Sequence, residues 1–497
     1  MTAAVQQEES AVAVLRNRKF LSLWIAQVVT QVGGNMVLFG LTVEVFALTG
    51  KSTSVSLLIL SFLVPAVIFG AIAGVYVDRL DRRLILVVAN AARGALFLLL
   101  LVVPQDVLII CLITAVISTL STFFGPAEIA MIPVVVPRKH LLPANSLHIV
   151  TLQASFFLGF ALLGPLVVKI SNQQVLLVLV AASYFIGALL CWMLPSYNPR
   201  IGGHNPREGL GEAGGALKTT FDQLAEGVRF IVRNRNVFWP LTYLALTASL
   251  IGVLGVLGPG FATQVLGLAE TDFVVVVLPL GVGLIFGILV LNVYGKHFSR
   301  RRGIEGGLVL LGVTLLALSL VQPIMNHIQL AVSLLSIVIA VAFAAGIAYS
   351  FVAVPAQTQL QEELPADVRG RVFGVLNMLV SIASFLPIII VGPIADSVGT
   401  SWVVAGSAII VLLVAAGSIL RARPTTEAPL STTGLVDAMD PVALTGRSLT
   451  APVSLHYVED SGDVRAVNLL SPVVPGQPGP ANGDDAAPIT HREQPSP

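Results

Sequence analysis

The sequence has little charge and almost no cysteine. Only 11% of its 497 residues are Asp, Glu, Lys or Arg, whereas soluble domains carry about 25%. This excludes a water-soluble globular fold, and a net charge of +1 excludes a nucleic-acid binder of the basic type. Cys111 and Cys191 both lie in apolar runs, so no disulfide framework is available. The seven histidines lack metal-ligand spacing. With no nucleophile beside a base, we predict neither an enzyme nor a bound metal or cofactor.

Long apolar runs take the place of the missing charge. A helix needs about 20 apolar residues to cross a bilayer, and barrel strands are shorter and alternate. We therefore predict an all-α membrane protein with twelve transmembrane helices. Their expected ranges are 20–47, 54–77, 84–103, 107–131, 147–169, 173–194, 237–264, 273–295, 304–324, 329–353, 372–395 and 401–420.

The positions of Lys and Arg predict the orientation. With a cytoplasmic N-terminus, inside segments hold 22 of these residues and outside loops hold two, Lys51 and Lys169. Cytoplasmic loops carry an excess of Lys and Arg. We therefore expect a multi-pass protein of the cell membrane with both termini in the cytoplasm.

The chain repeats itself at offsets of 217 to 229 residues. Arg16-Asn17-Arg18 precedes the first span as Arg233-Asn234-Arg235 precedes the seventh, and Gly164-Pro165 in the fifth matches Gly392-Pro393 in the eleventh. Six spans per half make the two copies parallel, an arrangement by which one transporter class achieves alternating access. The predicted domains are an N-terminal half (1–195), a linker (196–236), a C-terminal half (237–423) and a tail (424–497).

The two non-repeated segments have different patterns. In the linker, an apolar face recurs at helical spacing, which predicts an amphipathic helix against the membrane or the bundle; its residues are Leu217, Phe221, Leu224, Val228 and Ile231. The tail holds 11 of the 29 prolines and no long apolar run. We expect it to be a disordered cytoplasmic segment.

A charged loop joins the second and third spans. Its sequence, Gly74-Val-Tyr-Val-Asp78-Arg79-Leu-Asp81-Arg82-Arg83, resembles the signature Gly-x-Leu-x-Asp-Arg-x-Gly-Arg-Arg of the major facilitator superfamily. A carboxylate just below the membrane can lie at a neighbouring helix N-terminus, and arginines can bind carboxylates or lipid phosphates. We interpret four residues of this loop as a conformational gate, namely Asp78, Arg79, Arg82 and Arg83. The alternative is that these residues only follow the positive-inside rule. Asp81 stands where the signature has glycine, which is the residue that takes a left-handed turn without strain.

Other stretches resemble the branch of enterobactin-type siderophore exporters and macrolide efflux pumps. They are Phe124–Pro133 followed by Leu142–Leu147, Gln223–Asn234, and Pro365–Arg371. Gly159 through Gly164-Pro165 is similar to a motif associated with exporters, although Val167 and Val168 replace its closing glycines. The resemblance covers about residues 16–423. It implies the twelve-helix major facilitator fold, with spans one, four, seven and ten lining a central cavity.

Polar side chains within spans are candidates for function. Gln27, Gln31 and Asn35 recur every four residues in the first span, and we predict that they line the substrate cavity, the alternative being hydrogen bonds between packed helices. Arg93 lies about 14 Å deep at 1.5 Å per residue. Glu128 is its predicted partner, either as a structural ion pair or as part of a substrate site.

The resemblance implies export driven by proton antiport, which needs a carboxylate that titrates. Asn35 stands where relatives often carry an acid, so Glu128 and Glu44 are the remaining coupling candidates. We therefore predict a secondary transporter that exports a small amphipathic compound, with that substrate, protons and membrane lipid as partners. The alternatives are an importer or lipid flippase on the same scaffold, and a receptor or scaffold that works through its tail.

Overall fold

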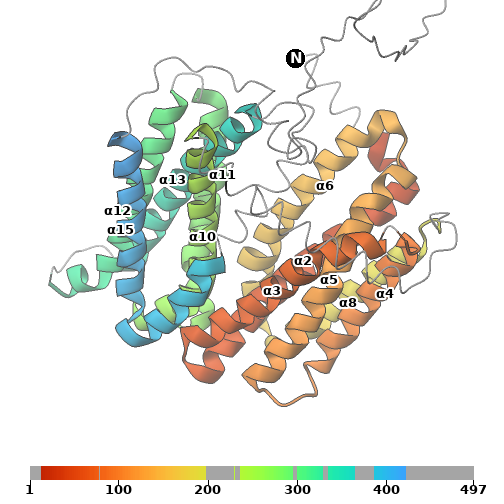
Figure 1. Ribbon diagram of the computed structural model, residues 1–497. Helices are drawn as coiled ribbons and strands as arrows, with labels where there is room; N and C mark the ends of the chain where they lie inside the picture. Colours follow the sequence, from red (N-terminus) through yellow and green to blue (C-terminus); the bar gives the residue numbers. More distant parts are fainter. Residues whose placement is uncertain are drawn as a thin grey trace, which may run out of the picture. The chain divides into compact units, whose positions relative to one another are not determined.

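The computed structural model describes residues 13–77, 79–196, 229, 235–294, 299–327, 334–363 and 385–420. All regular elements of this described part are helices (Figure 1). The predicted linker helix, most of the linker, the tail, Asp78 and the motif at 365–371 lie outside the described residues.

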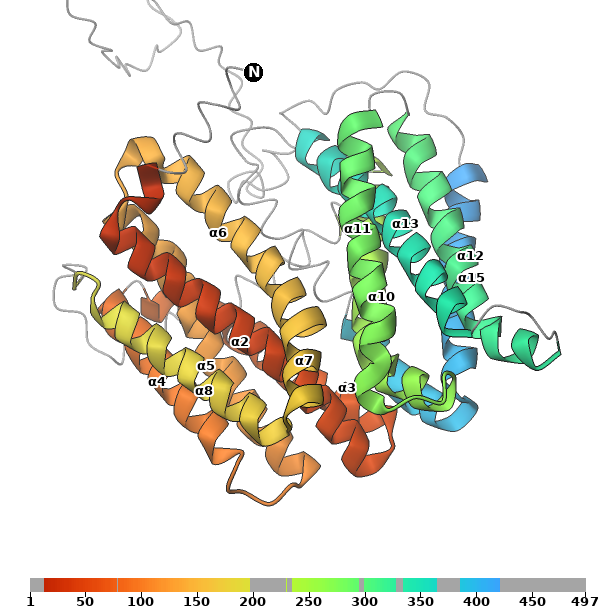
Figure 2. The ribbon, with the colours of Figure 1, turned by 180° about the vertical axis from the view of Figure 1, so that it is seen from behind.

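The N-terminal half consists of the helices between residues 18 and 192. They are α2 (Arg18–Thr49), α3 (Ser52–Val77), α4 (Arg82–Leu99), α5 (Val107–Val135), η1 (Arg138–His140), α6 (Leu141–Phe156), the π-helix η2 (Phe157–Leu163), α7 (Gly164–Ile170) and α8 (Gln173–Trp192). Helices α6, η2 and α7 together form the fifth predicted span. In Figures 1 and 2, α2, α4, α5 and α8 lie side by side.

The C-terminal half consists of the helices from residue 235 onward. They are α10 (Arg235–Gln264), η3 (Glu270–Phe273), α11 (Val274–Tyr294), α12 (Arg300–His327), α13 (Leu334–Glu363), the helix Phe385–Val398 and α15 (Thr400–Leu420). Helix α13 packs on α10, α11 and α12, and α15 packs on α12.

Ten segments among the described residues are long and apolar enough to cross a membrane. Two further helices stand where the third and eleventh spans were predicted. Helix α4 carries Arg82, Arg83 and Arg93, which lower its mean hydropathy, and the helix Phe385–Val398 covers the second part of the eleventh span. The remainder of that span lies outside the described residues.

Polar residues cap the apolar helices. Asn17 accepts hydrogen bonds from the backbone N–H groups of Lys19 and Phe20 at the start of α2, and Asp106 caps α5 in the same way. Helix α2 ends at Gly50, whose φ of 64° is left-handed, a conformation that glycine adopts without a Cβ clash. We name the two faces of the helical bundle after the residues at the ends of α2, as the Arg18 face and the Gly50 face.

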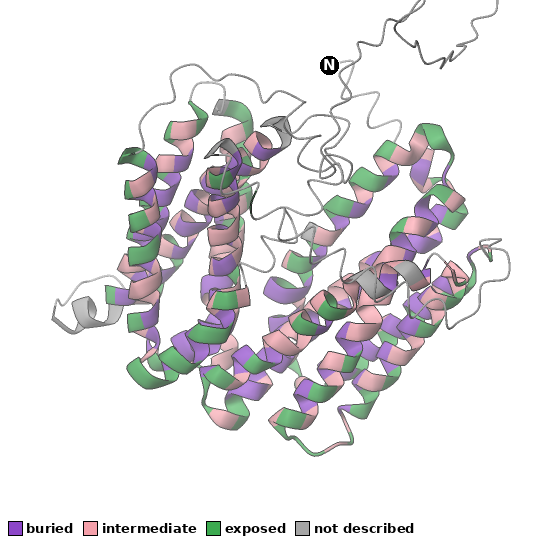
Figure 3. Cartoon of the chain, viewed as in Figure 1, coloured by how far each residue is buried: buried purple, intermediate pink, exposed green. Residues whose placement is uncertain are grey.

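Each half has its own apolar core. One N-terminal cluster surrounds Leu86, Met131 and Cys191, and a C-terminal cluster surrounds Leu308 and Val352. Large apolar side chains such as Leu189 on α8 and Leu413 on α15 are exposed, and exposed residues recur along the helices of both halves (Figure 3). Exposed apolar side chains in such number fit a lipid environment.

A close contact shapes the fifth span. A Cβ at Gly159 would lie 2.5 Å from the carbonyl oxygen of Val32, so only glycine lets η2 approach the backbone of α2 this closely. Gly164 lies similarly against Phe39. The stretch that resembles the exporter motif is therefore where the π-helix packs against α2.

Candidate functional site

The charged loop is held by the N-terminal half. Asp81 has φ −63° and ψ 113° and caps α4 by accepting a hydrogen bond from the N–H of Arg83. Its conformation is that of an N-cap, so aspartate fits where the signature has glycine. Arg82 donates to the carbonyl oxygen of Ala130 at 2.8 Å, and the Arg83 guanidinium lies 4.9 Å from the ring centre of Trp192. Arg79 is the second residue after the end of α3 and is half-buried.

The three polar side chains that recur every four residues along α2 lie in two different environments. Gln27 is buried and donates to the carbonyl oxygen of His148 on α6 at 3.1 Å, a hydrogen bond between packed helices. Gln31 and Asn35 are half-buried, and the Asn35 amide donates to the backbone carbonyl of Gln31. The side-chain amide of Asn35 thus makes a bond within its own helix.

Arg93 lies in a polar nest inside the N-terminal half. Its side chain is 4% exposed and donates to Ser121 Oγ, to Asn90 Oδ1 and to the carbonyl oxygen of Ala89. The guanidinium also lies 4.4 Å from the ring centre of Phe124 and 4.7 Å from that of Tyr184. Hydrogen bonds and cation–π contacts together compensate for burial of the charge.

Glu128 is near Arg93 but is not paired with it. The two residues form no ion pair in the described part of the chain, and Glu128 Oε1 is buried without a hydrogen-bond partner. Glu44 lies half-buried near the end of α2, beside Gln173 at the start of α8. The structure therefore brings together Arg93, Asn90 and Glu128, and it places Glu44 elsewhere, near the Gly50 face.

The two halves are joined by polar contacts at the Gly50 face. Asp396 accepts hydrogen bonds from the backbone N–H groups of Ser52 at 2.7 Å and Thr53 at 2.9 Å, and from Thr53 Oγ1 at 2.5 Å. Its carboxylate thereby caps α3 from the other half. Ser56 Oγ donates to the carbonyl oxygen of Ile388. A Cβ at Gly392 would lie 2.4 Å from Ser56 Oγ, so these two helices are in close contact.

A second contact between the halves lies near η3. Lys169 and Asp272 form an ion pair of 2.8 Å. Next to it, the ring of Phe273 stacks on Phe39 of α2, with 5.0 Å between ring centres, and meets Phe160 edge-on. Both connections are at the Gly50 face, and both join helices of different halves.

Sequence reasoning missed the roles of Ser52, Thr53, Asp396 and Asp272. The available signal was weak: Asp396 is an acid at the end of a predicted span, and Ser52-Thr53 directly precedes the span predicted from residue 54. Nothing local relates residues 344 positions apart. Among the described residues, no group of three or more His, Cys, Asp or Glu side chains could hold a metal ion.

Comparison with known proteins agrees with this architecture. The profile of the Major Facilitator Superfamily matches residues 23–388. The chain is 26% identical over 393 residues to the uncharacterized MFS-type transporter YfiS of Bacillus subtilis (strain 168), covering 78% of this chain and 89% of that protein. It is 20% identical over 403 residues to macrolide efflux protein A of Streptococcus pyogenes, covering 80% and 94%.

The fold matches that of solved transporters. The crystal structure of the nucleoside transporter NupG superposes with a TM-score of 0.60 at 13% identity, covering 80% of this chain and 98% of that one. The predicted resemblance to this superfamily and to macrolide efflux proteins is thus confirmed. With its two helical halves and a family match over residues 23–388, the chain belongs to the Major Facilitator Superfamily and is a membrane transporter.

Proposed function

We propose that the chain exports small amphipathic compounds from the cell by alternating access, with residues 16–195 rocking against residues 237–423. The observation that carries this proposal is the junction at the Gly50 face, where Asp396, Lys169 and Asp272 join halves that each have their own core. The halves also share an apolar cluster around Phe273 at this face, so each half can move as a body once this cluster opens together with the polar contacts. The similarity to macrolide efflux protein A supports export.

The proposed orientation makes the Gly50 face the outer one. The excess of Lys and Arg in the opposite segments supports cytoplasmic termini. In the described conformation the polar contacts then close the outer side, so substrate would enter from the cytoplasm. Export would require Asp396 to release α3 and the halves to come together at the Arg18 face.

For the closure at the Arg18 face we propose the charged loop as the gate. Arg82 and Arg83 are held by Ala130 and Trp192 of the same half, so the loop moves with that half. Asp78 and Arg79 would then meet the C-terminal half when the halves close on the cytoplasmic side. Cytoplasmic lipid phosphates would bind the same arginines in the open state.

Within the N-terminal half we assign Gln31 and Asn35 to the substrate cavity, because their side chains are half-buried. Gln27 and Arg93 are engaged with His148 and with the polar nest, which favours a structural role for both.

Proton antiport is proposed as the driving force, with Glu128 as the coupling group. Glu128 Oε1 has no hydrogen-bond partner although it is buried, and three of the five N–H groups of Arg93 donate to other acceptors. Glu128 can therefore change its protonation state without breaking an ion pair. Glu44 is the second candidate because it is half-buried near the proposed outer face.

The test is accumulation of ethidium or a macrolide in energised cells that express the chain, with and without a protonophore. Export predicts lower accumulation than in control cells, and both the protonophore and Asp78→Asn should abolish the difference. Unchanged accumulation, with the protein present in the membrane, would contradict export of these compounds.

The variant Glu128→Gln distinguishes a role of Glu128 in proton coupling from a role in packing. A coupling role predicts normal yield of folded protein with export that no longer responds to the proton gradient. Reduced yield of folded protein would show instead that Glu128 serves the packing around Arg93.

A further inference from the structure

A basic pocket lies at the Arg18 face, between the start of α2 and the connection from α5 to α6. It has a volume of about 680 Å³ and is open to its surroundings. Its walls are residues 17–19 and residues 133–138. The side-chain amide of Asn17 donates to the carbonyl oxygen of Val135 at 2.6 Å, and Figures 1 and 2 show the start of α2 beside this connection. This hydrogen bond joins the two walls.

Three residues of these walls carry a positive charge and none carries a negative one. They are Arg18, Lys19 and Arg138. All three are exposed, and within the described part of the chain their side chains form no ion pair and no hydrogen bond. Like charges around one pocket repel each other and attract an anion. The pocket therefore suits a negatively charged ligand.

The grouping of these charges goes beyond what the orientation of the chain requires. The positive-inside rule explains why Lys and Arg stand on one side of a membrane, but it does not bring them to one pocket. Asn17 and Val135 are 118 positions apart, and the contact between them sets the cations of α2 beside Arg138. The fold thus builds one site from two distant segments.

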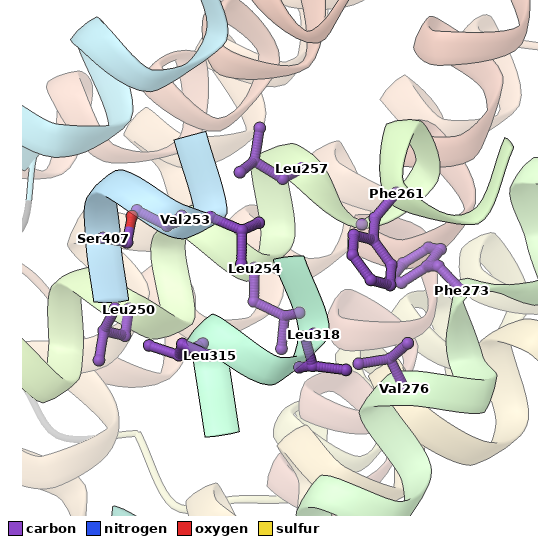
Figure 4. Close-up of a pocket in the computed structure, with 12 residues that line it drawn as sticks. Leu250, Val253, Leu254, Leu257, Phe261, Phe273, Val276, Leu315, Leu318 and Ser407 are labelled. Carbon is purple, nitrogen blue, oxygen red and sulfur yellow. The ribbon is translucent and has the colours of Figure 1, made fainter. Parts of the chain in front are cut away.

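A pocket of the C-terminal half shows the opposite chemistry. It lies between α10, α11, α12 and α15, and its labelled side chains are leucine, valine and phenylalanine with one serine (Figure 4). Ser407 supplies the only side-chain oxygen in its walls, and this hydroxyl donates to the carbonyl oxygen of Val403. An anion would find no partner there, in contrast to the basic pocket.

The cations of the basic pocket indicate a phosphate group as the ligand. A guanidinium binds phosphate through two parallel N–H···O bonds, and a lysine adds a point charge. The volume is within the range of about 300–1,000 Å³ that is usual for small-molecule sites. A phosphate together with a polar group of the size of glycerol therefore fits.

The depth of the pocket favours a membrane lipid as the source of this phosphate. The first predicted span begins at residue 20 and the fourth ends at residue 131, so the walls lie directly outside the hydrocarbon core. Headgroups occupy roughly 5–8 Å on each side of that core. Leu142, four residues after Arg138, is 75% exposed. An apolar side chain next to cations is typical of the boundary between headgroups and acyl chains.

We propose that the basic pocket binds the headgroup of an anionic phospholipid, and that the bound lipid links the start of α2 to the connection from α5 to α6. The pocket shares no residue with the charged loop at 74–83 or with Gln31 and Asn35. The proposal therefore does not depend on the proposed export function. A ligand that binds only the folded protein raises its melting temperature, so the lipid stabilises the N-terminal half.

The first test compares three probes on the purified full chain in a neutral detergent. Phosphatidylglycerol should raise the melting temperature by several degrees and remain bound in native mass spectrometry. Phosphatidylcholine has the phosphate but no net charge, and it should bind more weakly. Inorganic phosphate at the same concentration should leave the melting temperature unchanged. A rise with inorganic phosphate equal to that with phosphatidylglycerol would refute a lipid as the ligand, and equal binding of the two lipids would refute recognition of the anion.

The second test distinguishes the pocket from diffuse surface charge. Arg138→Gln removes a cation from the wall, and Lys139→Gln is the matched control, because Lys139 is the next residue, is exposed and does not line the pocket. Arg138→Gln should raise the Kd for phosphatidylglycerol about ten-fold, as expected for loss of a hydrogen bond from a charged group. Lys139→Gln should change it by less than about two-fold. Equal effects of the two variants would overturn the proposal.

A third variant tests the other wall. Arg18→Gln should weaken binding as Arg138→Gln does, and the double variant should lose the response of the melting temperature to phosphatidylglycerol. Both residues are exposed, so without lipid these proteins should melt like the wild type. If a glutamine variant does not fold, the corresponding lysine variant keeps the charge but loses the two parallel bonds, and it should weaken binding by a smaller factor. Unchanged binding in the double variant would refute the site. Because no assay uses a transported compound, failure of the export function leaves these results unaffected.

Discussion

Replacing Asp396 by alanine removes the carboxylate by which the C-terminal half caps α3. Three hydrogen bonds are lost, from the N–H groups of Ser52 and Thr53 and from Thr53 Oγ1. The N–H groups of the first turn have no acceptor within their own helix. Because donor and acceptor belong to different halves, the loss destabilises the joined state and leaves each half folded.

The size of the effect follows from capping energetics. Loss of an N-cap costs about 0.5–2 kcal/mol, and a negative charge at a helix N-terminus contributes about 0.3–1 kcal/mol. Asp396 is exposed, where salt screens the charge, so we use a total of about 1 kcal/mol. This changes the ratio of separated to joined molecules about five-fold.

Double electron–electron resonance measures the distance between spin labels attached at Val102 and Trp402. The distribution of these distances reports the ratio of separated to joined molecules directly. Both positions lie at the Gly50 face, one in each half, and they are 78% and 73% exposed. The native Cys111 and Cys191 are buried, so labelling is confined to the introduced cysteines.

Asp106→Ala is the matched control. Asp106 caps α5 through the N–H groups of Leu108 and Ile109, which is the same chemistry within one half. It should lower the melting temperature and leave the distance distribution unchanged. An Asp396→Ala protein that is folded and has an unchanged distribution would refute the assignment of Asp396 to the junction.

Three further substitutions test other contacts. Gly159→Val should lower the melting temperature by several degrees, because a Cβ there would lie 2.5 Å from a backbone oxygen of α2 and overpacking costs about 1–3 kcal/mol. Gly125→Ala should leave the melting temperature unchanged, because Gly125 has open space around it. Arg93→Lys should also lower the melting temperature, since hydrogen bonds to a charged group contribute about 1.5–3 kcal/mol and lysine cannot donate in the planar geometry of a guanidinium. An unchanged melting curve would show that the polar nest around Arg93 does not stabilise the protein. Lys169→Ala should shift the Val102–Trp402 distances less than Asp396→Ala does, because an exposed ion pair contributes about 0.2–1 kcal/mol. The shift caused by Lys169→Ala should disappear in high salt. A shift that does not depend on salt would contradict this.

The sequence predicts the elements of this fold better than their contacts. Apolar runs locate the helices because this signal is local. The repeat of Gly164-Pro165 at Gly392-Pro393 predicts two related halves. It does not predict that Gly392 packs against α3, because that contact is formed only when the halves meet.

The candidate site shows the same limit. Asn90 lies three residues before Arg93 on α4, and this helical spacing brings the two side chains into contact. The rings of Phe124 and Tyr184 come from two other helices, and no pattern indicated that they enclose the guanidinium. Depth in the membrane predicts that Glu128 lies near Arg93, but it does not predict whether the two side chains form an ion pair.

The cap on α3 also has a consequence for biosynthesis. Ser52 and its acceptor Asp396 are 344 residues apart, and translation proceeds at about 5–20 residues per second. The first turn of α3 therefore waits about 20–70 s for the residue that completes it. During this time the N-terminal half is in the membrane with an uncapped helix end at its surface, and the arrival of Asp396 marks the point at which assembly of the two halves can finish.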